Sequence, residues 1–291
     1  FVGGVRRPSR KMAGNSQQPP PPFAVEGEVL VFEDRPGNEI HLAVVVRRIT
    51  NARPTHGGGK TFVRVERRRL YDALGLLRAL RHDVAQYNEA MALNKADGLD
   101  AAVRRRLGTW RLLQQASALG VRLPRAGEGA VSVHGLDELI ELVEASFPEQ
   151  LADARRSVAE GVVHFDALAE FYTPGRAVVE HGVGTGVQGA PTAYMVRGCY
   201  YSRTKTLFGE GCTFYAALEG VVAVGDRFAL VEHTHLVGEF AGTRTTRAGA
   251  AGAGAHEHVE LSAELRARLV ARGRAYAAMA ASPTLMEHPA G

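Results

Sequence analysis

Four histidines in the second half of the chain have a spacing that can place metal ligands together. His233 and His235 lie two residues apart in a run of strand-forming residues, so their side chains should share one face of a strand. His256 and His258 repeat this spacing, but they lie beside a Gly/Ala-rich segment and do not form an H-E-x-x-H pattern. A zinc site needs at least three protein ligands held together. We therefore expect these histidines to serve in packing or at the surface, and no metal is predicted.

Two glycine-rich segments match phosphate-binding loops only in part. The segment 57–61, GGGKT, has the end of a P-loop, but Pro54 stands where the first glycine of that loop belongs, and a strand-like run follows. The segment 184–189 spells G-x-G-x-x-G, yet Pro191 and another strand-like run follow where a dinucleotide site requires a helix N-terminus. Both segments are predicted to be turns or loops, and no cofactor is expected.

The two cysteines, Cys199 and Cys212, do not indicate catalysis or a disulfide-stapled secreted fold. Cys199 lies in the middle of a predicted strand, with no helix N-terminus to lower the pKa of its thiol. No catalytic constellation emerges elsewhere, so the chain is not expected to be an enzyme by itself. Reduced thiols favour an intracellular protein, cytoplasmic or nuclear. No apolar run reaches the length of a membrane span, so no membrane partner is expected.

A modest basic excess permits a phosphate-bearing partner. The net charge is +4, and the sequence pI is about 9.2. The best basic group consists of Arg47, Arg48, Arg64 and Arg67. Aromatic residues are sparse around it, unlike in single-strand-binding proteins. These arginines are candidate partner-binding residues, and a stand-alone nucleic-acid-binding module that uses them is the alternative to the function considered below.

Hydrophobic periodicity predicts an α+β protein. The strands are expected at 28–32, 41–48, 61–66, 176–181, 192–201, 212–224 and 227–237. The helices are expected at 67–87, 99–119, from 135 to 147, from 148 to 161, in a short segment at 165–172, and at 260–280. In the second half, apolar residues on both faces of the strands suggest a compact sheet or a partly open barrel.

Changes in composition divide the chain into five parts. Residues 1–25 form a Pro-rich tail that is expected to be disordered, since four consecutive prolines exclude a helix. An N-terminal α+β region with a helical insertion spans 26–134, and a β-rich domain spans 135–246. A flexible Gly/Ala insert at 247–259 leads to a connecting helix at 260–291.

Several residues of the β-rich part occur in an order that is similar to a known family. They are Phe165, Asp166, Leu168, Tyr172, Pro174 and Gly175, then Phe240 and Gly242, and finally Arg272, Gly273, Arg274 and Tyr276. In this order they resemble the N-terminal domain of unknown function that precedes the core of fungal-type AAA+ ATPases. The resemblance covers about residues 40–291. No complete Walker motif is present, so the family's ATP-binding residues match no position here, and an ATPase is implied only if a core follows Gly291.

The resemblance implies a non-catalytic region that recruits a protein partner or substrate, or couples it to a downstream ATPase core. An apolar groove beside the sheet would then hold a peptide. Phe171 and Tyr172, in the aromatic end of the short helix, are the candidate residues for this groove.

Overall fold

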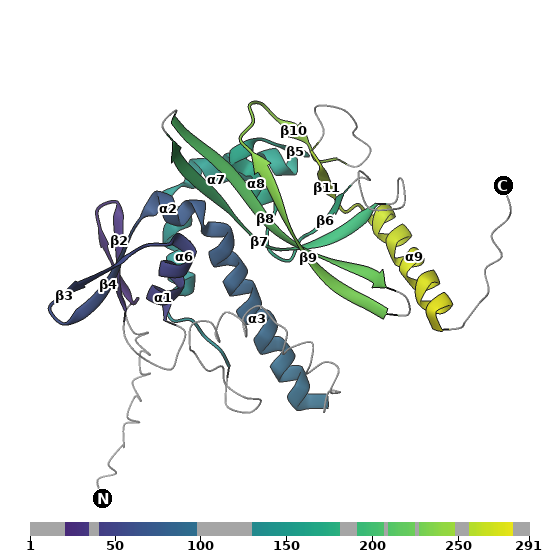
Figure 1. The fold of residues 1–291 in the computed structure, drawn as a ribbon, viewed down its shortest axis with the longest axis horizontal. Coiled ribbons are helices and arrows are strands. Elements are labelled where there is room, and N and C mark those ends of the chain that lie inside the picture. The colour runs from purple at the N-terminus through teal and green to yellow at the C-terminus, as the bar shows by residue number, and fades with distance from the viewer. Residues whose placement is uncertain are drawn as a thin grey trace, which may run out of the picture.

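The fold is α+β, as predicted. The computed structural model describes residues 21–34, 41–97, 130–180, 191–206, 209–224, 227–247 and 256–281. In Figure 1 a small sheet lies on the left, a larger sheet with long strands lies on the right, and helices run between them. The predicted helix at 99–119 and the G-x-G-x-x-G segment lie outside the described residues.

The small sheet is antiparallel and has the order β1-β2-β4-β3. Its strands are β1 (Phe23–Glu26), β2 (Val29–Asp34), β3 (Pro54–Gly57) and β4 (Lys60–Glu66). Alternate residues of β2 and β4, among them Phe32 and Val63, are fully buried on one face. The predicted strands at 28–32 and 61–66 are therefore confirmed. GGGKT makes the turn between β3 and β4, where Gly58 and Gly59 have positive φ.

The prediction of a strand at 41–48 was wrong. Residues Leu42–Thr50 form the helix α1 instead. Val residues favour strands, but Leu42, Val45 and Val46 are spaced so that a helix buries all of them on one side. Packing of this apolar side in the same core as β2 and β4 overrides the local preference for a strand.

The helices α2 (Arg67–Asp72), α3 (Leu74–Asp97) and α6 (Leu136–Ser146) complete the first core. The predicted helix at 67–87 is present, but it is interrupted at Ala73. Leu139 and Val143 of α6 pack with the N-terminal sheet rather than with the β-rich part. The change from the first core to the second therefore falls within α7 (Pro148–Ala159), after Leu151, and not at residue 135.

The second core lies under the larger sheet. Its antiparallel order is β11-β6-β7-β8-β9. The strands are β6 (Ala177–Glu180), β7 (Thr192–Thr206), β8 (Gly209–Val224), β9 (Arg227–Gly238) and β11 (His258–Glu260). Smaller elements beside it are β5 (Val162–Val163) with β10 (Arg244–Thr245), the 3-10 turn η1 (Phe165–Ala167) and α8 (Leu168–Phe171). The four strands predicted between 176 and 237 and the short helix are confirmed.

The end of the chain differs from the prediction at one boundary. β11 pairs with β6, and its His258 and Val259 are buried, although both residues were assigned to the flexible insert. The helix α9 (Ala263–Ala281) follows and confirms the predicted C-terminal helix. Its Leu265 packs with Val179 and Val259 in a small third cluster.

The helix α3 packs against both cores. Leu77 and Leu80 belong to the first core, while Gly75 and Ala79 face the strand β7. A Cβ added at Gly75 would lie 2.4 Å from Cys199 Sγ and 2.5 Å from the Cys199 carbonyl oxygen. Glycine is thus required here because helix and strand approach too closely for a side chain.

Replacing Gly75 by alanine should therefore destabilise the protein, although alanine favours helices. Overpacking of this kind costs about 1–3 kcal/mol. Gly273→Ala is the matched control, because Gly273 lies in α9 and a Cβ there meets nothing within 4 Å. Urea unfolding should show a loss for Gly75→Ala and no loss for Gly273→Ala. Equal effects of the two changes would contradict the close approach.

Candidate functional site

A cleft opens where α1, α3 and β7 meet. Its volume is about 310 Å³. Apolar side chains form much of its wall, and polar groups converge on it from all three elements. The lining residues are Val45, Arg48, Ile49, Asn51, Leu76, Ala79, Leu80, Asp83, Arg197 and Tyr200. An apolar cavity with a few placed polar groups is the usual form of a binding site.

A β-bulge brings Arg197 to the cleft. The pairing of β7 with β8 shifts register between Val196 and Gly198, which leaves Arg197 as the extra residue. Such bulges redirect a side chain and are frequent beside functional sites. The Arg197 guanidinium donates a hydrogen bond to the Glu219 carboxylate on β8, and this contact fixes its position.

The C-terminal end of α1 supplies two further polar groups. Asn51 ends the helix with φ of 51°, the left-handed conformation that residues other than glycine seldom adopt. Among the described residues, it is the only non-glycine residue with positive φ. Arg48 is exposed on the last turn of α1, and no side chain in the described part of the chain pairs with its guanidinium. The rim of the cleft thus carries a positive charge that is available to a ligand.

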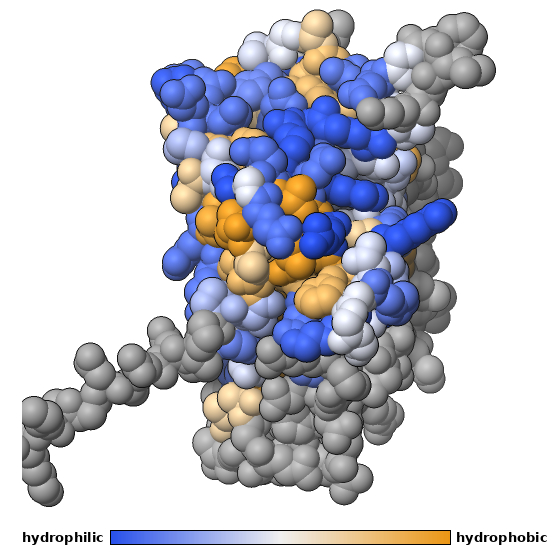
Figure 2. All heavy atoms as spheres, turned by 90° about the vertical axis from the view of Figure 1, so that its left-hand side faces the viewer, coloured by the Kyte–Doolittle hydropathy of each residue, from blue (hydrophilic) through white to orange (hydrophobic). Residues whose placement is uncertain are grey.

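The other predicted arginines are engaged within the fold. Arg47 forms an ion pair with Asp34 at 3.4 Å, and Arg64 with Glu26 at 3.3 Å. Arg67 donates a hydrogen bond to the carbonyl oxygen of Gly27 at 2.6 Å. Only Arg48 of the predicted four lines the cleft. Figure 2 shows the side of the molecule that carries β1 to β4, where hydrophilic residues surround an apolar area. Three of the four predicted arginines therefore have partners within the fold, and the nucleic-acid alternative stays a prediction.

Phe171 and Tyr172 do not line the cleft. Both side chains are fully buried in the second core. The Arg176 guanidinium lies over the Phe171 ring at 5.2 Å, and the Tyr172 ring packs against Phe214. Their position favours the structural role over direct contact with a partner.

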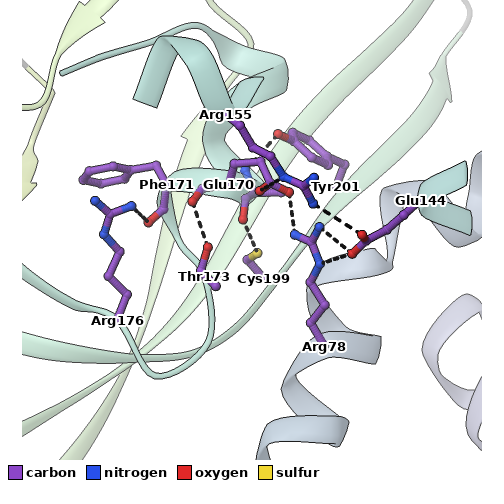
Figure 3. A network of polar contacts seen from close by, with 10 residues as sticks. Arg78, Glu144, Arg155, Glu170, Phe171, Thr173, Arg176, Cys199 and Tyr201 are labelled. Carbon is purple, nitrogen blue, oxygen red and sulfur yellow. Dashed lines mark hydrogen bonds and ion pairs between the residues drawn. The ribbon is translucent and has the colours of Figure 1, made fainter. Parts of the chain in front are cut away.

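A buried arginine connects the helix of the cleft to the second core (Figure 3). Arg78 of α3 has 8% exposure and contacts Glu144 of α6 at 2.8 Å and Glu170 of α8. Arg155 of α7 reaches the same two carboxylates from a half-exposed position. Burial alone would raise the pKa of Glu144, but the hydrogen bonds and charges of Arg78 and Arg155 lower it overall. The network fixes α3, and with it one wall of the cleft.

Three of the four candidate histidines come together in the structure, which their sequence spacing did not predict. His235, His256 and His258 are all more than nine-tenths buried, whereas His233 is exposed. The Tyr172 hydroxyl lies 2.9 Å from His256 Nε2 and 3.0 Å from His258 Nδ1. Burial lowers the pKa of His256 to about 3 and that of His258 to about 2. As the side chains stand, no three His, Cys, Asp or Glu groups of the described residues are arranged as a metal site.

The remaining candidates for chemistry have structural roles. Cys199 is fully buried, and burial raises the pKa of its thiol to about 12, which makes it a poor nucleophile. Lys60, in the P-loop-like segment, forms an ion pair with Glu33 at 2.8 Å.

The chain matches no protein-family model, no curated protein and no solved structure. Within the described residues, no helix is long and apolar enough to cross a membrane. Functional inference therefore depends on the geometry of the site.

Proposed function

We propose that this chain is a non-catalytic recognition region that holds a peptide segment of a protein partner in the cleft between α1, α3 and β7. In keeping with its resemblance to the region ahead of an AAA+ core, it would recruit that partner for a downstream ATPase or couple the two. The cleft is the single observation that carries the proposal, because it joins an apolar wall to the Arg48 guanidinium, which has no side-chain partner among the described residues.

The size of the cleft suits a peptide side chain. About 310 Å³ lies at the lower end of the range of roughly 300–1,000 Å³ for ligand pockets. Ile49 and Leu76 would contact an apolar side chain, while Arg48 would pair with a carboxylate next to it. The predicted ligand is thus an apolar residue flanked by Asp or Glu.

The site is also built to be stable before a ligand arrives. Glu219 fixes Arg197, and the network around Arg78 fixes α3. A wall that is already ordered loses little entropy on binding, which favours affinity from a small contact area.

Selection of random 12-residue peptides by phage display would test this function. Peptides that bind the wild-type protein would then be exposed to an Ile49→Trp variant, in which a large side chain fills the cleft. Peptides that also bind this variant would be removed. We expect the surviving sequences to share an apolar residue next to Asp or Glu. Recovery of the same peptides on both proteins, or of basic peptides, would contradict the proposal.

Charge reversal at the rim should then weaken binding of the selected peptide. Arg48→Glu is expected to raise its Kd by about 10- to 100-fold, since a charged hydrogen bond contributes about 1.5–3 kcal/mol. Arg69→Glu is the matched control, because Arg69 is an exposed arginine of α2 that does not line the cleft. Isothermal titration calorimetry would measure both. Equal effects would mean that the peptide responds to overall charge and not to the cleft.

A further inference from the structure

The outer end of the β8–β9 hairpin carries exposed apolar side chains. Among the described residues, five of the eight exposed large apolar side chains lie on these two strands, so they gather in one place. Exposed fractions between 37% and 60% are found at the outer end, for Val221, Val222, Leu230 and Val231. Single exposed apolar residues need no explanation, but a group of them marks an interaction site.

This end of the hairpin extends beyond the neighbouring strand. The ladder between β7 and β8 stops at the pair Tyr194 and Gly220, whereas the ladder between β8 and β9 continues to the pair Val224 and Arg227. In Figure 1 the two strands therefore leave the rest of the larger sheet as a pair. A ribbon of two strands is only marginally stable in water, and it gains stability when further strands continue the sheet.

β9 offers an open edge for a further strand, because it is the last strand in the order β11-β6-β7-β8-β9. Within the described ranges, its backbone hydrogen bonds go to β8 alone. Residues 229–234 are all exposed, and β9 approaches β11 only near His235, whose ring centroid lies 4.5 Å from that of His258. Edge strands are usually protected by Pro, Lys or a bulge, and residues 229–234 have none of these.

We propose that β9 pairs in antiparallel orientation with β9 of a second copy of this chain, with the two-fold axis at Leu230. Such pairing would join two larger sheets into one continuous sheet, and the same surface of each copy would form the contact. Leu230 would lie opposite Leu230 of the second copy, and Ala229 would lie opposite Val231 of that copy.

The register at Leu230 continues the apolar pairs of the hairpin. Val221 lies opposite Leu230 within one copy, so the dimer would contain a row of four apolar side chains, two from each copy, on one face of the sheet. On the other face, Val222 lies opposite Ala229, and the second copy would add its Val231 to that row. The exposed side chains of both faces would thus gain apolar neighbours.

The charge of Glu232 distinguishes this register from the alternatives. A two-fold axis at Glu232 would place two carboxylates directly opposite each other, which is destabilising. With the axis at Leu230, the two Glu232 residues are four positions apart along the strands, or roughly 14 Å. This separation exceeds the Debye length of about 8 Å at physiological ionic strength. An axis at His233 would require residues 235–237, where β9 approaches β11.

The proposed contact is small, so the dimer should form reversibly. Residues 227–233 would make the new ladder, about seven residues from each copy, whereas a standard interface has roughly 20–30 residues a side. Interfaces of less than standard size are typical of transient complexes. We therefore expect an equilibrium between monomer and dimer with a Kd in the micromolar range.

Analytical ultracentrifugation of the full chain at increasing concentration tests the proposal. The average mass should rise from 31.2 kDa toward twice that value. Leu230→Lys should raise the Kd of the dimer by at least about tenfold, because it places two like charges opposite each other. Val25→Lys is the matched control and should leave the Kd unchanged. Val25 lies on β1, an edge strand of the other sheet, and is 47% exposed, compared with 50% for Leu230.

Single cysteines test the register. Leu230→Cys should give a disulfide-linked dimer under mild oxidation, since the two residues would face each other at close range. Val231→Cys should not, because its neighbour would be Ala229 of the second copy. Cys199 and Cys212 are buried, and the wild type under the same oxidation gives the background.

Three results would overturn the proposal. A wild type that stays monomeric at every concentration would assign the open edge to a strand of another protein. A dimer that persists in Leu230→Lys, or is lost equally in Val25→Lys, would place the contact elsewhere. Cross-linking through Val231→Cys and not through Leu230→Cys would exclude the register. Residues of β9 do not line the cleft, so peptide binding there and dimer formation can fail separately.

Discussion

Arg78→Ala is expected to lower the free energy of unfolding by about 3–5 kcal/mol, because two carboxylates would lose their buried partner and keep only the half-exposed Arg155. Glu170 and Glu144 would both lose the guanidinium that lies between them, and Glu170 is only 11% exposed. Urea denaturation followed by circular dichroism would measure the loss. Because the same contacts fix the position of α3, the variant should also bind a peptide in the cleft more weakly.

Arg155→Ala is the matched control for this prediction. Its guanidinium contacts the same two carboxylates at 3.2 and 3.3 Å, but its side chain is 53% exposed. Water screens such a contact, so the change should cost no more than about 1 kcal/mol. If both variants lose the same stability, the burial of Arg78 does not determine its contribution.

Acid should weaken the same network. The pKa of Glu144 in the folded protein lies below the ordinary value of 4.5, since Arg78 and Arg155 outweigh the effect of burial. A group with a lowered folded pKa contributes stability that is present above its unfolded pKa and is lost as the pH falls through its folded pKa. The stability difference between the wild type and Arg78→Ala should therefore shrink below about pH 4.5.

Phe171→Ala should have a comparably large effect. The ring is fully buried in the second core and packs edge-to-face against Tyr172 at 5.0 Å. Deleting a buried phenylalanine side chain costs about 3–5 kcal/mol, whereas Phe171→Leu should cost less than about 1.5 kcal/mol. Thermal unfolding of both variants would decide the role of this residue. A variant that kept its stability but lost a selected peptide would restore Phe171 to the binding site.

The local sequence pattern was sufficient to predict most of the helices and strands. Runs of strand-forming residues predicted β2, β4 and β6 to β9, and Pro148 with Gly161 bounded α7 and its exit turn correctly. The strands β1, β3 and β11 were not predicted, and β1 begins at Phe23, inside the tail at 1–25 that was expected to be disordered. The local pattern also failed at α1, where three consecutive valines favoured a strand. The decisive factor there is a core formed by β2 and β4, which a local window does not contain.

The sites depend on contacts that no local pattern contains. The spacing of His233 and His235 correctly predicted a shared strand face, but the meeting of β9 with β11 depends on how the whole sheet curls. Similarly, Arg48 was a candidate from its charge alone, while Arg197 lines the same cleft at a bulge in β7, which the sequence did not indicate. The spacing of the histidines could be seen in the sequence, but their contact across the sheet could not be predicted from it.

The position of α3 between the two cores has a consequence for synthesis on the ribosome. One side of this helix packs fully only when β7, about 120 residues later, has been made, because Gly75 and Ala79 pack against Cys199 and Gly198. At translation rates of roughly 5–20 residues per second, the side of α3 that faces β7 remains without its partner for roughly 6–24 s. A nascent chain that ends before α8 also lacks Glu170, the partner of Arg78. Such a chain would expose the side of α3 that is buried in the folded protein, and chaperones could bind it.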